Sequence, residues 1–510
     1  MQTENEFIKQ QQNKESPFSF VDPNKIGRKI IKCAIEPTGN IEQDKLLIKK
    51  MLEQTLSIHG DNVSMMDVLY KYYKNTFDLN KCKSNRPDID NVIRIPESYR
   101  ITRDLNGHIC GSGVIFSDNT GNFEKEISNF NGFLKETKMD TNYVIANNNA
   151  SIYGIGYYYI EPNNSDETKE TPFLIETENI DPKNTYCVYN YDTIPKKTWA
   201  VRYYTPNDNA NTIYTVWTKY AVYKFTLEGS NLQFLSKPYE LGYGAIPIIE
   251  VVRNPSRLGD SELVLELIRA KSLLMSSRID DVQQVVDYVY LLINLNLKSQ
   301  TSEEKKQEFD EILKSRVIEL ECNNPQVNSD VRLLENKLDQ TAIQQLADYI
   351  DRLINSIVSL PDRNSTSTGT SDTGVANDYK LGFRSLSSYS DIVTKFMIES
   401  LRDILRIALT ITKYKSKEFS KAIGKLTTKA IDVKPQCNKI FSVTDAANAY
   451  SSLRSAGMND TDSVKVTGIS QDIAETVKRN KIELEEKIAY EEKQNSNQQN
   501  GITTKEKETQ

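Results

Sequence analysis

Two long runs of apolar residues at helical spacing, with a compact insertion between them, constrain the fold of this chain most strongly. The first run predicts a helix over residues 261–286, about 39 Å long if it is continuous, because an α-helix rises ~1.5 Å per residue. The second predicts a helix over 337–360, which Pro361 ends. The insertion contains two strand patterns, "YVYLLINL" and "RVIELE", the charged helix "SEEKKQEFDEILKS" and the turn "NNPQ". The chain must therefore include a helical hairpin with a small αβ tip.

The N-terminal half has the pattern of a mixed helix and strand domain. Apolar residues at helical spacing predict helices over 44–56, 65–77 and 123–150. Short β-branched segments, "NVIRIP", "YRITRD" and "GVIFSD", predict strands, with a hairpin turn at "DLNGHICG". Further strands are expected at 151–161, 184–190, 198–205, 212–218, 221–229 and 231–237. Many of the 27 tyrosines lie in these strands, and we interpret them as sheet packing rather than as a ligand platform.

A stretch of small polar residues, "NSTSTGTSDTGVAND" (364–378), follows the second hairpin helix and precedes another long helix at about 379–415. On composition alone this stretch is typical of a flexible linker. A basic segment at 414–429 and a charged helix near the C-terminus follow. The polar residues 1–25 and 493–510 predict disorder at both ends.

Composition bounds the architecture and the partners. A chain of 510 residues predicts about three domains. Its 64 basic and 70 acidic side chains leave a net charge of −6, which argues against a large surface that grips nucleic-acid phosphates. No apolar run approaches the ~18 residues of a membrane span, and the polar N-terminus lacks the apolar core of a signal peptide. We therefore expect a protein that neither spans a membrane nor is secreted.

The usual residues of a catalytic or metal site are sparse. The two histidines, His59 at a helix end and His108 in the expected hairpin turn, are interpreted as surface polar residues. The six cysteines are scattered without a C-x-x-C pair. "AIGKLTTK" has Leu426 where a P-loop needs Ser or Thr, and adjacent carboxylates such as Asp280 and Asp281 are expected on an exposed helix surface. The sequence therefore argues against an enzyme, and we expect no cofactor or metal.

Several segments, taken in order, resemble the portal proteins of tailed double-stranded DNA bacteriophages. "LYKYYKNTFDL", followed by "DIDNVIRIPESYRITRDLNGHICGSGVIFSD", resembles the start of that family. "NNASIYGIGYYYIE" and "IDPKNTYCVYNYDTIPKKTWAVRYY" are similar to its helix-to-strand segment and its strand pair. "YGAIPIIEVVRNPSRLGDSELVLELIRAKSLLMSSRIDDVQQ" resembles the strand and the acidic helix start that open its first stem helix. The resemblance covers about residues 65–490.

The resemblance implies an α+β portal fold in four parts. These are a strand-rich wing (26–255, with a long helix and basic connector at 379–429), a stem of two helices (256–286 and 337–363), a clip (287–336) and a helical crown (430–492). Twelve copies would form a ring at one capsid vertex, through which double-stranded DNA passes without sequence-specific contact. The clip would bind the terminase large subunit and later a neck or adaptor protein. Major capsid and scaffolding proteins are further expected partners, in the host cytoplasm during assembly and then in the virion.

The resemblance also gives the polar stretch a role as a tunnel loop that faces DNA in the channel. The tunnel-loop candidates are Asn364, Ser365, Thr366, Ser367, Thr368, Gly369, Thr370, Ser371, Asp372, Thr373, Gly374, Asn377 and Asp378. Arg363, Lys380 and Arg352 are candidates for centring the DNA, although each also fits an ordinary cation at a helix end.

The clip-interface candidates are Tyr288, Tyr290, Leu291, Leu292, Ile318 and Leu320, and some of them fit packing within or between subunits equally well. Two other classes of function stay open. One is another ring-forming virion component, such as a neck adaptor or minor head protein. The other is a nucleic-acid enzyme with a metal site that no motif marks.

Overall fold

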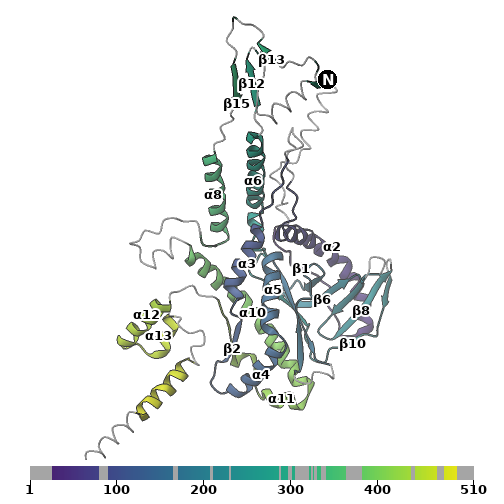
Figure 1. Ribbon diagram of the computed structural model, residues 1–510. Coiled ribbons are helices and arrows are strands. Elements are labelled where there is room, and N and C mark those ends of the chain that lie inside the picture. Colours follow the sequence, from purple (N-terminus) through teal and green to yellow (C-terminus); the bar gives the residue numbers. More distant parts are fainter. Residues whose placement is uncertain are drawn as a thin grey trace, which may run out of the picture. The chain divides into compact units, whose positions relative to one another are not determined.

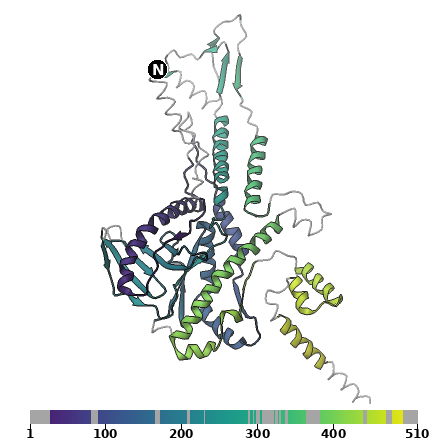
Figure 2. The ribbon, with the colours of Figure 1, turned by 180° about the vertical axis from the view of Figure 1, so that it is seen from behind.

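The computed structural model describes most of the chain, which divides into two compact units (Figures 1 and 2). The first unit comprises Met1–Gly27, Asp61–Thr102 and Gly259–Ser387, and the second comprises Arg28–Gly60, Arg103–Leu258 and Ser388–Gln510. The described residues are 26–79, 90–164, 171–206, 211–228, 231–286, 289–293, 295–296, 301, 303–304, 321–322, 326, 330–334, 340–362, 382–437, 443–467 and 476–490. Each unit is described by itself below.

In the described part of the second unit, seven strands form the largest sheet. Its order is β1-β5-β6-β7-β8-β10, with β9 also paired to β8. Only β1 and β5 run parallel, and every other pair is antiparallel. The strands are β1 (Ile31–Lys32), β5 (Thr185–Tyr189), β6 (Lys197–Tyr204), β7 (Ile213–Trp217), β8 (Ala221–Glu228), β9 (Asn231–Phe234) and β10 (Tyr239–Glu240). The strands predicted between 184 and 237 are confirmed.

One face of this sheet packs against the N-terminal part of α2 (Ile41–Tyr73), the purple helix in Figure 1. Trp199, Tyr223 and Phe225 of the sheet are fully buried with Ile48 and Leu52 of the helix. Large side chains of this kind each bury enough apolar surface to contribute about 2 kcal/mol or more. The core of the second unit therefore lies between the seven-stranded sheet and α2.

The structure contradicts the surface interpretation of His59. Its side chain is 2% exposed, stacks on Tyr186 at 4.4 Å between ring centroids, and has Nε2 2.9 Å from the carbonyl oxygen of Lys183. Burial lowers the pKa of this histidine to about 4, and the backbone hydrogen bond offsets only part of that shift. His59 is therefore a neutral residue of the core at neutral pH.

A second sheet and a pair of short strands complete the strand structure of the second unit in the described residues. The three-stranded sheet has the order β11-β3-β4, with β3 (Gly156–Pro162), β4 (Phe173–Glu176) and β11 (Ile248–Val251). In the other pair, β2 (Val114–Asp118) runs antiparallel to β16 (Ile431–Pro435). β16 falls on the crown side of the boundary that we expect at residue 430, although its ladder joins it to β2.

The helices of the C-terminal half follow the predicted pattern. α10 spans Phe383–Lys415, close to the long helix expected at about 379–415. Other helices of the second unit are α4 (Glu124–Glu136), α5 (Met139–Tyr153), α11 (Lys417–Ile423), α12 (Val443–Ser455), α13 (Asp460–Thr467) and a last helix at 476–490. The predicted α+β class is confirmed.

Two predictions about the N-terminal half are wrong. The segment expected to form the strand "YRITRD" and a hairpin turn is one helix, α3 (Glu97–Cys110), which includes His108. Its buried residues Ile101, Leu105 and Ile109 recur every four positions, a helical spacing that outweighs β-branched composition. The helices expected at 44–56 and 65–77 are the single helix α2, because nothing crowds Gly60 and a glycine inside a helix costs only about 1 kcal/mol.

The strand predicted from residue 151 starts later, because α5 continues to Tyr153 and ends at Gly154. Gly154 has φ +82° and its N–H donates to the carbonyl oxygen of Ala150 at 3.0 Å, which is a left-handed helix cap. A Cβ at this position would overlap the carbonyl oxygen of Arg257. Only glycine satisfies both the backbone angle and the close approach.

We predict that Gly154→Ala lowers the free energy of unfolding by about 3–4 kcal/mol, from left-handed strain and backbone overlap together. Gly121→Ala is the matched control, because Gly121 has φ +73° and no atom lies within 4 Å of the point where an alanine Cβ would stand. This control should lose only about 1–2 kcal/mol. Urea unfolding of both variants measures the difference, and equal losses would show that the approach of Arg257 is unimportant.

Candidate functional site

In the first unit, α6 (Leu265–Val286) and α8 (Gln340–Ile357) lie side by side (Figures 1 and 2). A 3-10 turn at Glu262–Val264 precedes α6, so the helical segment matches the expected 261–286 closely. α8 is shorter than the expected 337–360. These two helices form the predicted hairpin.

Polar contacts fix the direction and register of the pair. Arg278 of α6 donates to the Gln344 side chain at 2.8 Å, and Lys271 pairs with Asp351. Moving seven residues back along α6 moves the contact seven residues forward along α8, so the helices are antiparallel. Seven residues are about two helical turns, which keeps both contacts on one face.

The described residues between the two helices include short antiparallel strands. β12 (Val289–Ile293) pairs with β15 (Asp330–Leu334), and β13 (Leu295–Asn296) pairs with β14 (Glu321–Cys322). The strand pattern "YVYLLINL" is confirmed, whereas β15 was not expected from the sequence. Most of the predicted charged helix lies outside the described residues, but residues 303–304 are helical.

An extended segment, residues 90–96, runs along α6 rather than in a sheet. Its backbone N–H groups donate to side chains that recur every four positions on the helix, in the pairs Ile95 to Ser272 at 3.1 Å, Ile93 to Ser276 at 2.9 Å and Asn91 to Asp280 at 2.9 Å. Two residues of extended chain rise about 6.6 Å and four helical residues about 6 Å, so the two repeats match. We call residues 90–96 the strap.

The strap corrects two expectations. "NVIRIP" is extended as predicted, but it pairs with helix side chains and joins no sheet in the described residues. Asp280, expected on an exposed helix surface, is 6% exposed and accepts both the backbone and side-chain N–H groups of Asn91. The carboxylate therefore satisfies donors that the extended backbone would otherwise leave unpaired.

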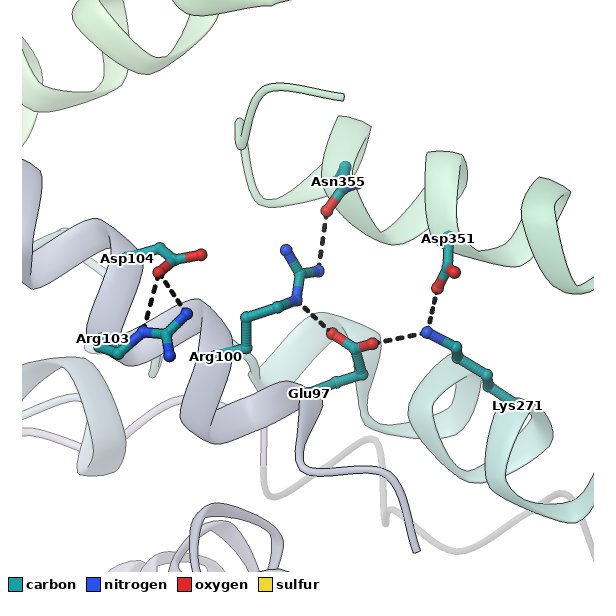
Figure 3. Close-up of polar contacts among 7 residues, drawn as sticks. All are labelled: Glu97, Arg100, Arg103, Asp104, Lys271, Asp351 and Asn355. Atoms are coloured by element: carbon teal, nitrogen blue, oxygen red, sulfur yellow. Dashed lines mark hydrogen bonds and ion pairs between the residues drawn. The ribbon is translucent and has the colours of Figure 1, made fainter. Parts of the chain in front are cut away.

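A partly buried ionic cluster joins the first turn of α3 to both hairpin helices (Figure 3). Glu97 accepts from Lys271 Nζ at 2.6 Å and from Arg100 Nε at 2.6 Å. Arg100 also donates to Asn355 of α8 at 2.9 Å, and Lys271 reaches Asp351 on the same helix. We call Glu97, Arg100, Lys271, Asp351 and Asn355 the stem cluster. Arg103 and Asp104, also drawn, belong to the second unit and pair with each other.

The electrostatics of the stem cluster are set by Glu97. Burial by itself would raise the pKa of this carboxyl, but the hydrogen bonds and charges of Lys271 and Arg100 outweigh burial and hold the pKa below its ordinary 4.5. Glu97 is therefore ionised at neutral pH. Its ionised form stabilises the fold above the unfolded pKa, and this contribution is lost as the pH falls through the lower folded value.

The predicted site residues are only partly visible in the structure. The tunnel-loop candidates, with Arg363 and Lys380, lie outside the described residues. Arg352 lies on α8 with its side chain 66% exposed and its Nε 3.6 Å from the carboxylate of Asp362. Its charge is thus partly balanced within the subunit.

Of the clip candidates, only the backbone of residues 290–292 is described, in β12. Tyr288, Ile318 and Leu320 lie outside the described residues. All of these assignments stay predictions.

Within the part of the chain that the structure describes, no group of three or more His, Cys, Asp or Glu side chains is arranged to hold a metal ion. In the same residues, no helix combines the length and apolar character needed to cross a membrane.

A family model for "Phage portal protein, SPP1 Gp6-like" matches residues 52–488. The chain belongs to this phage portal family. The resemblance read from the sequence is thereby confirmed, and the protein is a portal-type structural component of a phage virion. The match includes the hairpin, the strap and the stem cluster. A search of curated proteins finds no match.

Solved structures give more distant likenesses to this portal protein. The neck of an empty GTA particle computed with C6 symmetry has a TM-score of 0.39 at 9% identity, covering 79% of this chain and 93% of that chain. The virion of a native gene transfer agent (GTA) particle has a TM-score of 0.34 at 9% identity, covering 73% and 89%. At these TM-scores, the likenesses support no further conclusion.

Sequence reasoning missed the stem cluster, although a signal was present. Lys271 and Arg278 are seven residues apart on one apolar helix, and their partners Gln344 and Asp351 are seven apart on the other. Matching polar positions at this spacing on two antiparallel helices indicate cross-helix pairs. Glu97 gives no such signal, because the segment "YRITRD" that follows it has the composition of a strand rather than of a helix.

We predict that Lys271→Met lowers the free energy of unfolding by about 2–3 kcal/mol at pH 7, because it leaves the buried carboxylate of Glu97 and the partly exposed one of Asp351 with fewer cationic partners. Glu97→Gln should also flatten the loss of stability between pH 7 and pH 3.5, because the unfolded wild-type chain takes up a proton at Glu97 near pH 4.5, whereas the folded chain does so only at a lower pH. Glu53→Gln, at an exposed position of α2, controls for the loss of one carboxylate. Urea unfolding at both pH values would contradict the account if Glu97→Gln and wild type lost equal stability.

Proposed function

We propose that this portal protein forms a dodecameric ring at one capsid vertex and is the channel for DNA packaging and ejection. The family match over residues 52–488 carries this proposal. The antiparallel pair α6 and α8, with strands between them in sequence, supports it, because a rigid hairpin with a tip suits the wall of a channel.

The charge of the chain suits the passage of DNA. In a ring, each side chain is repeated around the axis, so a small preference per subunit is multiplied. Basic contacts to phosphates add affinity, and many of them would stop the DNA from sliding. A net charge of −6 per chain, with Arg352 partly balanced by Asp362, agrees with weak and non-specific contact.

The remaining parts of the proposal concern partners. The clip, residues 287–336, would bind the terminase large subunit during packaging and a neck or adaptor protein afterwards. Terminase would supply ATP hydrolysis, and the portal would hydrolyse nothing and need no cofactor. Major capsid and scaffolding proteins would contact the ring in the host cytoplasm, where assembly takes place.

Ring formation tests the proposal. Negative-stain microscopy of the purified protein should show closed rings of about twelve subunits, since head-to-tail interfaces that close by rotation generate rings. Particles that stay monomeric or dimeric over a range of salt and at high protein concentration would contradict the proposal.

Deletion of residues 366–374 should leave ring assembly intact and impair DNA packaging. The reason is that we assign these small polar residues to a loop that touches the moving DNA. Rings are counted by microscopy, and packaged DNA is measured by nuclease protection in particles. Normal packaging by the deletion variant would show that the segment is a passive linker.

A further inference from the structure

A cleft in the second unit has two adjoining pockets, with volumes of about 510 Å³ and 370 Å³. Tyr159, Glu161 and Tyr239 line both pockets, so the two form one continuous cleft around them. β3 supplies Tyr159 and Glu161, and β10 supplies Tyr239. The cleft lies wholly within the second unit.

Aromatic rings form much of its wall. The ring of Trp217 lies 5.6 Å from that of Tyr159, between centroids. Tyr239 and Tyr414 are 48% and 62% exposed, although they line a cleft, and Tyr243 also lines its smaller pocket. Exposed aromatic faces beside a cavity are typical of a binding surface, because rings of this size are usually covered.

Glu161 is the acidic group at the centre of the cleft. Its carboxylate accepts the Tyr159 hydroxyl at 2.6 Å. Burial raises the pKa of Tyr159, Tyr239 and Tyr243, and the nearby negative charge of Glu161 raises each of them further. The carboxylate therefore bonds one tyrosine hydroxyl and shares the smaller pocket with Tyr239 and Tyr243.

No basic side chain among the described residues pairs with Glu161, although several line the cleft. Arg202 donates to the carbonyl oxygen of Asn179 at 3.0 Å and lies over the Tyr204 ring at 5.4 Å. Lys415 donates to the Asn164 side chain at 2.7 Å. Arg202 and Lys415 are thus directed to other groups. Lys138 and Lys224 also line the larger pocket, and neither forms an ion pair with Glu161, whose hydrogen-bond partner within the described residues is a tyrosine.

We propose that this cleft binds an arginine side chain presented by a partner protein. A guanidinium group is planar, stacks on aromatic faces and bonds a carboxylate through two parallel N–H groups. Glu161 supplies the carboxylate, and the exposed rings of Tyr239 and Tyr414 supply the faces. A cation fits this position better than an anion, because Glu161 would repel a negative charge. The tyrosine stripe that the sequence indicates as sheet packing is then also a recognition surface.

The proposal is independent of ring formation, so either can fail alone. Its direct test is binding of the tripeptide Gly-Arg-Gly to the full chain, measured by isothermal titration calorimetry and by tryptophan fluorescence. The uncharged isostere Gly-citrulline-Gly is the matched ligand control. We expect the arginine peptide to bind at least about tenfold more tightly, since charge-assisted pairs exceed neutral ones in strength.

Three variants locate the binding. Glu161→Gln should weaken binding of the arginine peptide by at least about tenfold, whereas Glu178→Gln, at an exposed position outside the cleft lining, should change it by less than about twofold. Tyr239→Ala, at an exposed position, should weaken binding without loss of fold, which thermal unfolding checks. Equal binding of the citrulline peptide, unchanged binding by Glu161→Gln, or no binding of either peptide would overturn the proposal.

Discussion

The arrangement of the first unit depends on one partly buried amine. Lys271 lies between Glu97 and Asp351, so a single cation holds the start of α3 and the middle of α8 against α6. Burying charges costs several kcal/mol unless each has a partner, and removal of one partner exposes that cost. A shift of α3, α6 or α8 along the other two would therefore break an ion pair of Lys271. The strap adds a second constraint on α6, because its hydrogen bonds require Ser272, Ser276 and Asp280 on one helix face.

Much of the fold could be predicted from local patterns, because the spacing of apolar residues and the residue types in turns act within a few positions of the chain. The antiparallel strands β5 to β8 around Trp199 and the two hairpin helices could be predicted in this way. What could not be predicted depends on tertiary contacts. α3 is helical because each of Ile101, Leu105 and Ile109, on one face of the helix, is buried, and the strap is extended because α6 supplies acceptors at a matching spacing. The burial of His59 could not be predicted for the same reason, since its neighbours Tyr186 and Lys183 lie more than 100 residues away in the sequence.

The functional assignment came from a different kind of information. No catalytic motif marks the sequence, no metal cluster lies in the described residues, and the order of ordinary segments indicated a portal before any site did. The family match confirms that order over residues 52–488. The cleft around Glu161 shows the limit of such reasoning, because Tyr159 and Glu161 of β3, Tyr239 of β10 and Tyr414 of α10 converge only in the folded unit.

We propose, above all, that this chain encloses DNA at a single vertex of a phage capsid. The decisive measurement is cryo-electron microscopy of intact, DNA-filled particles, reconstructed about the axis of the tail vertex. We expect twelve copies of the chain at that vertex alone, with α6 and α8 of each copy around a column of DNA. Copies at every vertex, or a ring with no DNA through it in filled particles, would contradict the proposal.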